Sequence, residues 1–350
     1  MRVSSVLRDT PFSVLDRSRV REGEDAPRAL RDTVALAREA EAMGFHRFWV
    51  AEHHGVPGVA GSAPTVLAAA VAAATSRIRV GTGGVMLPNH QPLVVAEQFG
   101  VLESLFPGRI DMGLGRSVGF TDDVRRALGR GKDAAGAFGE QLTELLGWFT
   151  GDRAAHPRVR AWPAEGLRPA PFLLATGSGA DLAAQLGLPL VIGGIRGEDA
   201  MLRAVDRYRA AFRPSAWADA PHVVLSGTVA VAPSAAEARR MLIPEAWSTA
   251  YSRTHGVFPP LAPAEAIEAM TMTAAERGRF DAALAGQVHG APSEVAAALS
   301  SLLGRSGADE FLVTTSTYDR RRLIDSYRLL AGVLSLPPAE GPVHPGPAAG

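Results

Sequence analysis

The chain has 350 residues, and its 36 basic and 36 acidic side chains give a formal net charge of zero, which offers no sign of a nucleic-acid or anionic-membrane partner. Cysteine is absent, so disulfides, thiolate metal sites and thiol nucleophiles are excluded. The hydrophobic fraction of 47% suits a large core, and neither a membrane-length apolar run nor a signal pattern occurs, so we expect a cytoplasmic protein.

Short β-rich runs alternate with helical patterns along almost the whole chain. The predicted strands span residues 12–16, 47–51, 78–85, 109–114, 172–175, 190–192, 222–231 and 310–314. The predicted helices span residues 27–43, 64–75, 92–105, 132–150, 178–186, 198–212, 234–247, 292–303 and 323–334. Such alternation implies a parallel sheet, because each return to a parallel strand needs a crossover. We predict a (β/α)8 TIM barrel rather than an open doubly wound sheet, because there are eight strands and no GxGxxG motif follows the first.

Two segments interrupt this alternation. Residues 248–290 follow the seventh strand–helix unit with little periodicity beyond a short helical piece near residues 263–270, and we predict an insertion over or near the active-site face. The last residues, 335–350, read "SLPPAEGPVHPGPAAG" and are predicted to be a disordered tail. We therefore expect one domain over residues 1–334.

Glu52, His53 and His54 end the second predicted strand. They could be polar surface or core groups, metal ligands, or an acid–base site. Imidazole and carboxylate suit zinc or iron. However, adjacent histidines on an extended segment point to opposite sides, and the other strand ends supply no Asp, Glu or His cluster, so we predict no metal site. A single histidine that faces the pocket and acts by hydrogen bonding or proton transfer is the favoured interpretation.

Glycine-rich strand ends indicate a ligand pocket. The run "GTGGV" (residues 81–85) suits a flat ligand lying against bare backbone, although a kinked strand would look similar. Gly177, Ser178 and Gly179 precede an alanine-rich helix, as in a phosphate site, although a plain helix cap has the same appearance. Arg116, at the end of the fourth strand, could be the counter-charge for a phosphate or part of a surface salt bridge.

Three stretches together resemble the bacterial luciferase-like flavin monooxygenases. They are "FWVAEHHGVPGVAGSAP", "SRIRVGTGGVMLPNHQPLVVAEQFGVLESLFPGRIDMGLGRSVG", and "GSGADLAAQL" followed by "GLPL". The similarity is dense over residues 12–120 and looser over residues 172–195 and 292–334. It is closest to the single-component-type luciferase-family oxidoreductases, and it is specific for the superfamily but not for the substrate.

The resemblance implies a TIM barrel that takes reduced FMN from a separate flavin reductase. In the family, O2 then gives a flavin hydroperoxide that oxygenates a small organic substrate. His53 matches the catalytic histidine beside the flavin, with Glu52 before it and His54 facing away. The residues that match the family's cofactor-binding positions are Gly83 and Gly84 (a non-prolyl cis peptide at the flavin face), Arg116 (phosphate) and the phosphate loop Gly177, Ser178 and Gly179.

The resemblance also implies a homodimer through the helices after strands two and three, in which His54 reaches Glu97 of the partner. The sequence departs from luciferase in three places. A reactive cysteine is replaced by Gly115, an acid before the phosphate serine is replaced by Thr176, and a second phosphate-binding arginine has no clear equivalent, although Lys132 is a candidate.

Two other functions fit the same residues: a deazaflavin-dependent dehydrogenase of the same superfamily, and a non-enzymatic flavin-binding protein. The substrate cannot be read from the sequence. Phe12 and Phe258 could line an apolar pocket, with core packing as the alternative role for both.

Overall fold

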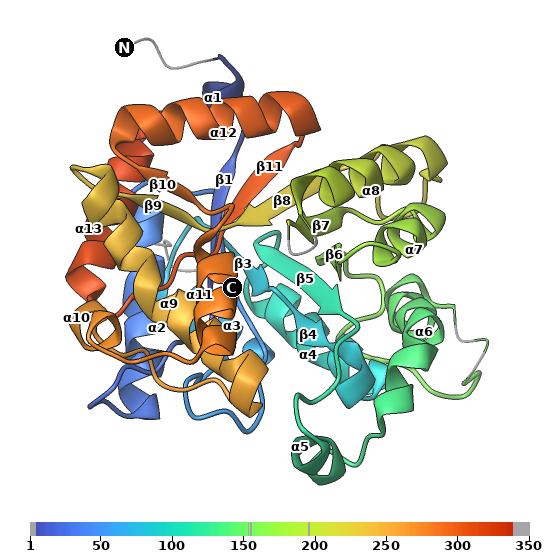
Figure 1. Cartoon of the computed structure of the whole chain (residues 1–350). Helices are drawn as coiled ribbons and strands as arrows, with labels where there is room; N and C mark the ends of the chain where they lie inside the picture. Colours follow the sequence, from blue (N-terminus) through green and yellow to red (C-terminus); the bar gives the residue numbers. More distant parts are fainter. Residues whose placement is uncertain (1–4, 153, 155, 195–196, 339–350) are drawn as a thin grey trace.

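Eight parallel strands surround a central axis in the computed structural model, which describes residues 5–152, 154, 156–194 and 197–338 (Figure 1). Around the axis the order is β3-β2-β1-β11-β8-β7-β6-β5, and pairing of β3 with β5 closes the ring. The strands are β1 (Phe12–Asp16), β2 (Arg47–Val50), β3 (Arg79–Thr82), β5 (Ile110–Gly115), β6 (Ala170–Ala175), β7 (Leu190–Gly193), β8 (Val223–Gly227) and β11 (Glu310–Val313). The predicted TIM barrel is confirmed.

Helices cover the outside of the barrel (Figure 1). The main ones are α2 (Ala26–Ala42), α3 (Pro64–Ala74), α4 (Pro92–Leu105), α6 (Phe138–Thr150), α7 (Gly179–Leu186), α8 (Glu198–Ala211), α12 (Pro292–Ser306) and α13 (Arg320–Leu334). Local sequence sets where they begin: the Asp25 carboxylate accepts the Arg28 N–H at the start of α2, and proline occupies the first turn of α3 and α4. Their apolar sides and the strands share one large core.

The barrel interior combines an apolar layer with buried charges. Leu15, Trp49, Phe172 and other apolar side chains form a separate cluster inside the ring. Beside it, Arg47 on β2 bonds two carboxylates, Asp111 (Nη1 to Oδ1, 2.8 Å) and Glu310 (Nε to each oxygen, 3.0 Å). Asp111 and Glu310 are almost fully buried. Since buried charges are costly unless paired, these residues depend on one another.

Two predicted strands are each divided in the structure. Residues 78–85 form β3 and the short β4 (Val85–Met86), with the Gly83–Gly84 peptide between them in the cis form. Residues 222–231 form β8 and β9 (Val229–Val231), because Thr315 exchanges hydrogen bonds with the backbone of Val229 at the break. β9 then leaves the barrel and pairs with β10 (Val288–Gly290).

The region after β9 is more regular than predicted. The expected helix 234–247 continues to residue 255 as α9 (Ala235–His255), and the expected insertion contains α10 (Ala264–Glu268), α11 (Ala274–Leu284) and β10. Residues after 247 lack an apolar period because polar Ser248 and Ser252 are buried on α9. α9 to α11 enclose a small core of their own.

Shorter elements complete the chain. The predicted helix 132–150 is a 3₁₀ segment, η2 (Lys132–Ala137), followed by α6. Unpredicted short elements are α1 (Ser5–Asp9), α5 (Asp122–Ala127) and the 3₁₀ turn η1 (Leu87–Asn89). At the predicted tail, Leu336 packs against the core, and residues 339–350 lie outside the described part of the chain.

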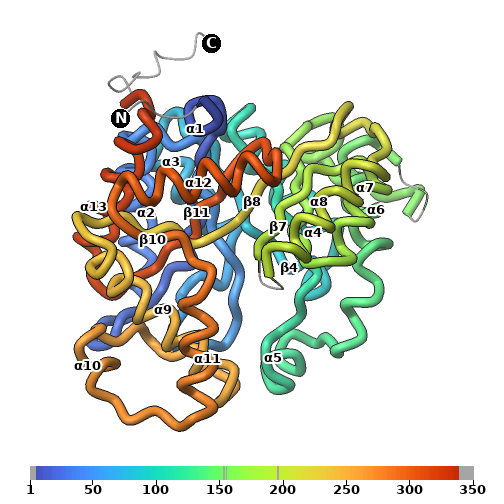
Figure 2. Tube along the Cα trace, turned by 45° about the horizontal axis from the view of Figure 1, so that its top comes forward, coloured from blue at the N-terminus to red at the C-terminus, as the bar shows by residue number. Residues whose placement is uncertain are grey.

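The two ends of the barrel differ. α5 and the α9–α11 segment project from the same end, where the strands reach their carboxyl termini (Figures 1 and 2).

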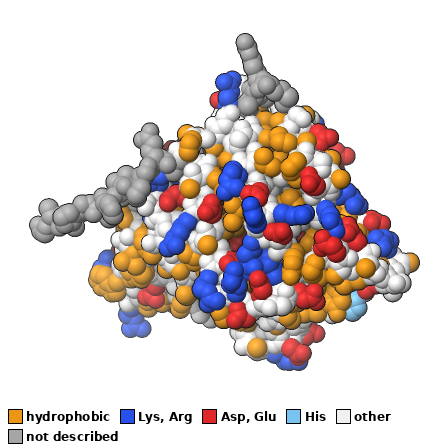
Figure 3. All heavy atoms as spheres, turned by 90° about the vertical axis from the view of Figure 1, so that its left-hand side faces the viewer, with side chains coloured by type: hydrophobic (Ala, Val, Ile, Leu, Met, Phe, Trp, Pro, Cys, Tyr) orange, Lys and Arg blue, Asp and Glu red, His pale blue; other side chains and the backbone are white. Residues whose placement is uncertain are grey.

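The face seen from the left of Figure 1 carries basic and acidic side chains side by side rather than an area of one sign (Figure 3). Within the described residues, no helix is both long and apolar enough to span a membrane.

Candidate active site

A cavity of about 1220 Å³ lies at the carboxyl ends of the barrel strands. Leu174, Val191 and Phe311 line it from the barrel, whereas Gln287 and Val288 line it from the segment that follows α11. In a TIM barrel this end carries the active site, because loops from several strands meet there. The cavity is large enough for a cofactor and a small substrate together.

One part of this cavity is suited to an anion. Arg116, Lys132, Ser178 and Gly179 all line it. The side chains of Arg116 and Lys132 are exposed and pair with no described residue. Ser178 directly precedes α7, where the N–H groups of Ala180 and Asp181 donate to the Gly177 (3.1 Å) and Ser178 (3.2 Å) carbonyls, so Gly179 carries the first-turn N–H that has no backbone acceptor among the described residues. Unpaired cations in the same cavity as a helix N-terminus provide both the charge and an N–H donor for a phosphate.

Local geometry requires glycine at two positions of the predicted phosphate loop, for a different reason at each. Gly177 has φ +74°, a conformation that favours glycine, and it lines an adjoining pocket of about 250 Å³ with Thr176 and Ser178. A Cβ on Gly179 would lie 2.8 Å from the Ala175 Cβ. The loop therefore folds tightly against β6 and leaves Ser178 at the border of both pockets.

The glycine-rich end of β3 allows close contact with β5. A Cβ on Gly81 would lie 2.4 Å from the Asp111 carbonyl oxygen, and one on Gly84 would lie 2.7 Å from the Gly113 carbonyl oxygen. After Gly84, Met86 of β4 pairs with Gly115 of β5, and both residues line the large cavity. Gly83 and Gly84 do not line the cavity themselves; they are followed by Met86, which does.

Glu52 is a hydrogen-bonding centre behind this wall. Its Oε2 accepts the Met86 N–H (2.9 Å), and its Oε1 lies near His54 Nε2 (2.8 Å), His90 Nε2 (3.0 Å) and the Asn89 amide nitrogen (3.0 Å). Burial alone would raise the pKa of Glu52, but the hydrogen bonds from His54 and His90 lower it to about 2. The carboxylate is therefore ionised at neutral pH and holds the β2 end against β4.

This convergence corrects part of the sequence interpretation. The strand ends were expected to supply no Asp, Glu or His cluster, but Glu52 and His54 at the end of β2 and His90 after η1 bring one possible ligand atom each within 4.8 Å of one another. His90 follows η1 and lies in the stretch "LPNHQP", where no periodic pattern marks it as a site residue. It was missed for that reason.

His53 lies in a different environment from His54. Its backbone N–H bonds the Gly61 carbonyl (2.7 Å), and its Nδ1 is buried without a partner among the described residues. Burial lowers its pKa to about 4, and the charges of Arg17 and Arg19 act in the same direction. His53 is therefore neutral at pH 7, so its ring offers one N–H donor and one acceptor.

Two phenylalanines connect His53 to the cavity. Phe258 packs edge-on against His53 (ring centroids 6.4 Å apart) and also contacts Phe120 (5.4 Å), which lines the cavity. His53 itself is not among the lining residues. Phe258 thus has a place beside the site, whereas Phe12 is fully buried and packs on Phe311 as a core residue.

The two residues predicted at a dimer interface are not in contact within the chain. His54 bonds Glu52, and Glu97 is half-buried on α4, where it makes no ion pair with any described residue. The positions where the sequence departs from luciferase, Gly115 and Thr176, and the candidate second phosphate-binding residue, Lys132, all line the large cavity.

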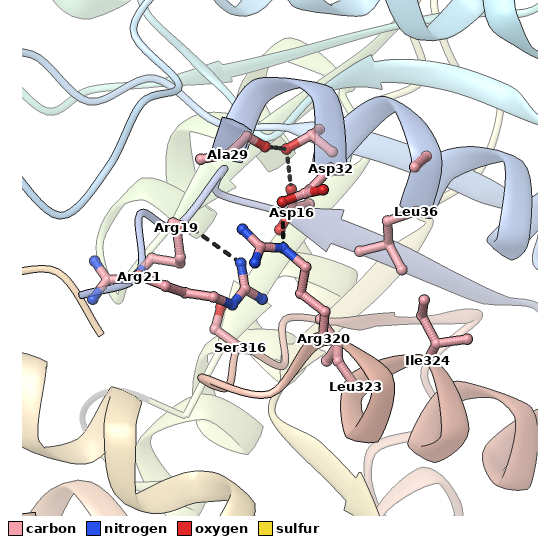
Figure 4. A pocket seen from close by; sticks show the side chains of 12 residues that line it. Asp16, Arg19, Arg21, Ala29, Asp32, Leu36, Ser316, Arg320, Leu323 and Ile324 are labelled. Carbon is pink, nitrogen blue, oxygen red and sulfur yellow. Dashed lines mark hydrogen bonds and ion pairs between the residues drawn. The ribbon is translucent and has the colours of Figure 1, made fainter. Parts of the chain in front are cut away.

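A third cavity, of only about 80 Å³, lies between β1, α2 and α13 (Figure 4). Charged side chains converge on it, and they are largely paired: Arg320 bonds Asp32 and Glu24, and Asp16 accepts from Thr33 (2.5 Å). Arg21 donates to the Tyr318 carbonyl (2.6 Å). These contacts fix the segment after β1, which carries Arg17 and Arg19 towards His53.

Comparison with known proteins identifies relatives along most of the chain. Residues 10–310 match the family model described as luciferase-like monooxygenase. A luciferase-like monooxygenase of Escherichia coli K12 is 36% identical over 326 residues, which is 92% of this chain and 96% of the relative.

Two solved structures share the fold. The crystal structure of apo-MsnO8 has 33% identity and a TM-score of 0.82, covering 95% of this chain and all of the other. The oxygenating constituent of 3,6-diketocamphane monooxygenase from Pseudomonas putida, in complex with FMN, has a TM-score of 0.67 at 17% identity, covering 92% of this chain and 97% of the other.

Proposed function

The chain belongs to the luciferase-like monooxygenase family of flavin-dependent monooxygenases, and from this premise we propose that it oxygenates a small organic substrate with O2 and reduced FMN. A separate flavin reductase would supply the reduced FMN as a dissociable co-substrate. One oxygen atom enters the substrate and the other leaves as water, with two electrons from the flavin. The observation that carries the proposal is that Arg116, Lys132 and Ser178 line the same barrel-end cavity, with Ser178 directly before α7.

The residues present fit FMN. Arg116 and Lys132 would pair with the phosphate, while the Ser178 hydroxyl and the Gly179 N–H at the start of α7 would bond its oxygens. The bare backbone of Gly83 and Gly84 would lie against the flat ring. When bound, reduced FMN supplies the electrons that activate O2.

The chain's own residues would control protons and water at the ring. His53 is neutral, and its buried Nδ1, which has no partner among the described residues, would bond a ligand group that reaches it past Phe258. Phe258 and Phe120 would exclude water from this region. Glu52 would act as a positioning residue, because it fixes the Met86 backbone that follows the two glycines.

Removal of the Arg116 side chain tests the phosphate assignment. Arg116→Ala should lower the affinity for reduced FMN by about 10- to 150-fold, since a charge-assisted hydrogen bond contributes about 1.5–3 kcal/mol. The affinity for riboflavin, which lacks the phosphate, should fall far less. Anaerobic titration of both flavins measures the difference, with Arg31→Ala on the exposed surface of α2 as a matched control. Equal losses for FMN and riboflavin would remove Arg116 from the phosphate site.

We also propose a homodimer through α3 and α4. Val66 on α3 is 69% exposed, and Val94, Val101 and Leu105 are 47%, 48% and 64% exposed on α4. The α4 residues are seven and eleven positions apart, so they share one helix face. α3 and α4 pack side by side and α3 has no charged residue, which gives a second copy an apolar surface to cover.

Light scattering tests this assembly. The wild-type chain should have twice its 36.7 kDa mass at micromolar concentration. Val101→Glu should give a folded monomer, because it places a charge in the centre of the apolar surface. Val6→Glu, at an exposed valine on α1, which packs against α12, should leave the dimer intact. A monomeric wild type, or a Val101→Glu dimer, would contradict the proposal.

A further inference from the structure

We propose, on the basis of the oxygenation proposed above, that the organic substrate is a neutral, mainly apolar molecule with one hydrogen-bonding oxygen, bound at the ends of β8 and β11. These two strand ends and the α11–β10 segment form one part of the large cavity, which we call the uncharged part. Its lining includes Ser226, Thr228, Thr314, Ala282, Gln287 and Val288.

The order of strands around the barrel separates the uncharged part from the proposed flavin site. Arg116 follows β5, and β11 lies four strands away from β5 around the closed ring of eight, which is the opposite side. Gly83 and Gly84 follow β3, and β8 lies opposite β3 in the same way. A flavin with its phosphate at Arg116 and its ring at the two glycines would therefore leave the ends of β8 and β11 open to a second molecule.

Charge is distributed unevenly over the cavity lining. The cationic side chains, Arg116, Arg125 and Lys132, come from the chain between β5 and α6. Glu198, at the start of α8, also lines the cavity, and it pairs with Arg305. None of the described residues that line the cavity from the ends of β8 and β11 or from the α11–β10 segment is ionisable. An ionic group of a substrate would have no counter-charge there, and burial of an unpaired ion is costly.

One cation approaches the uncharged part from outside the cavity. Arg17 Nη2 lies 3.5 Å from the Thr314 carbonyl oxygen, but Arg17 Nη1 pairs with Glu245 at 2.9 Å. The Arg17 side chain does not line the cavity. An anionic substrate would have to displace the Glu245 carboxylate to use this charge, so Arg17 does not make the uncharged part a site for anions.

Hydroxyl groups provide the polarity of the uncharged part. The side chains of Ser226, Thr228 and Thr314 are half-buried and pair with no described residue. A hydroxyl both donates and accepts hydrogen bonds, so these groups suit a carbonyl, hydroxyl or ether oxygen. Apolar side chains, among them Leu225 of β8 and Val288 of β10, line the cavity next to them. A ligand with a carbon frame and one oxygen would match both kinds of surface.

The uncharged part would stay open to solvent in the proposed dimer. Ala282 and Ala285 line the cavity and are exposed. α3 and α4, the helices of the proposed dimer, follow β2 and β4, whereas β8 lies across the barrel from β3. A substrate would therefore enter beside α11 without crossing the subunit interface.

Three ligands of matched shape test the substrate class: cyclohexyl methyl ketone, cyclohexanecarboxylate and cyclohexylmethylammonium. Binding to the full-length chain is measured by saturation-transfer NMR titration in excess oxidised FMN, which occupies the cationic part and permits no turnover. We expect saturable binding of the ketone, with an affinity at least about tenfold above that of either ion, because both ions would lack a counter-charge. Equal or tighter binding of either ion, or no saturable binding of the ketone, would overturn the proposal.

A bulky side chain tests the location. Ala282→Trp should lower the affinity for the ketone by about 5- to 150-fold, the effect of overfilling a site. Ala275→Trp is the matched control, because Ala275 is exposed on the same helix but does not line the cavity, and it should bind the ketone like wild type. Unchanged ketone affinity in Ala282→Trp would overturn the location. If Ala282→Trp fails to fold by circular dichroism, the selectivity of the wild type among the three ligands still decides the substrate class.

Single changes test the hydroxyl groups. At least one of Ser226→Ala, Thr228→Val and Thr314→Val should lower the affinity for the ketone by about 2- to 12-fold, the contribution of one neutral hydrogen bond. Full affinity in all three variants would overturn the hydrogen-bonding role of these side chains.

The substrate class and the oxygenation fail in different ways. Incorporation of ¹⁸O only into charged compounds would overturn the substrate class and support the oxygenation. Ketone binding that Ala282→Trp blocks, without ¹⁸O in any product, would support the site and contradict the oxygenation alone.

Discussion

His53→Ala should lose at least about 100-fold in product formation, the usual scale for a positioned acid–base group. The imidazole is buried and neutral, with a pKa of about 4, and its Nδ1 has no described protein partner. We expect the variant to bind FMN and fold normally, because the cations at Arg116 and Lys132 lie in another part of the site. Oxygen should still be consumed, but it should be released as hydrogen peroxide instead of entering the substrate.

Product yield and peroxide yield, measured with excess reduced FMN, test this expectation. His54→Ala is the matched comparison, since it removes the neighbouring imidazole, which bonds Glu52 rather than facing Phe258. It should lose much less turnover than His53→Ala. If His54→Ala abolished turnover in a folded protein while His53→Ala stayed active, the roles of the two histidines would be reversed.

Arg47→Ala should destabilise the protein by about 3–5 kcal/mol, the range for removal of one partner from a buried charge cluster. Arg47 is the shared partner of Asp111 and Glu310 inside the barrel. Burial alone would raise the pKa of Glu310, but His222 and the charge of Arg47 bring it down to about 2, so the carboxylate is ionised in the folded protein. Without Arg47, Glu310 would remain buried without the Nε–H that both of its carboxylate oxygens share.

Equilibrium unfolding in urea measures this change. Arg305→Ala provides a surface control, because Arg305 pairs with Glu198 while both side chains are about half exposed, and such pairs contribute about 0–1 kcal/mol. If Arg47→Ala lowered the free energy of unfolding by less than about 1 kcal/mol, the interior carboxylates would not depend on Arg47. Activity should fall only to the extent that the folded fraction falls.

The barrel could be predicted because the sequence features that mark each strand and helix lie within that strand or helix. Each strand is a short apolar run, and proline or an acceptor side chain marks several helix starts, as at Asp25 and Pro64. The boundaries were wrong where distant residues decide them. Thr315 interrupts residues 222–231, and burial of Ser248 and Ser252 against the rest of the molecule hides the continuation of α9 from any apolar pattern.

The candidate site was predictable in part for the same reason. Arg116, Ser178 and Gly179 stand at strand ends, so the barrel rule alone predicts that they meet, and they do line one cavity. The bonds of Glu52 to His90 and Met86 join residues 34 to 38 positions apart through a 3₁₀ turn, which no sequence period encodes. The contact of His53 with Phe258 likewise depends on how the α9–α11 segment folds back.

Oxygen uptake under ¹⁸O₂ tests the central claim most directly. The protein is mixed anaerobically with chemically reduced FMN or with a reduced deazaflavin, and then with labelled oxygen and a mixture of small organic compounds. We expect ¹⁸O in an organic product only with reduced FMN and only with the protein present. Reoxidation of the reduced deazaflavin by an organic acceptor, with no ¹⁸O in any product from FMN, would contradict the account and identify a dehydrogenase. FMN binding without any turnover would instead identify a flavin-binding protein.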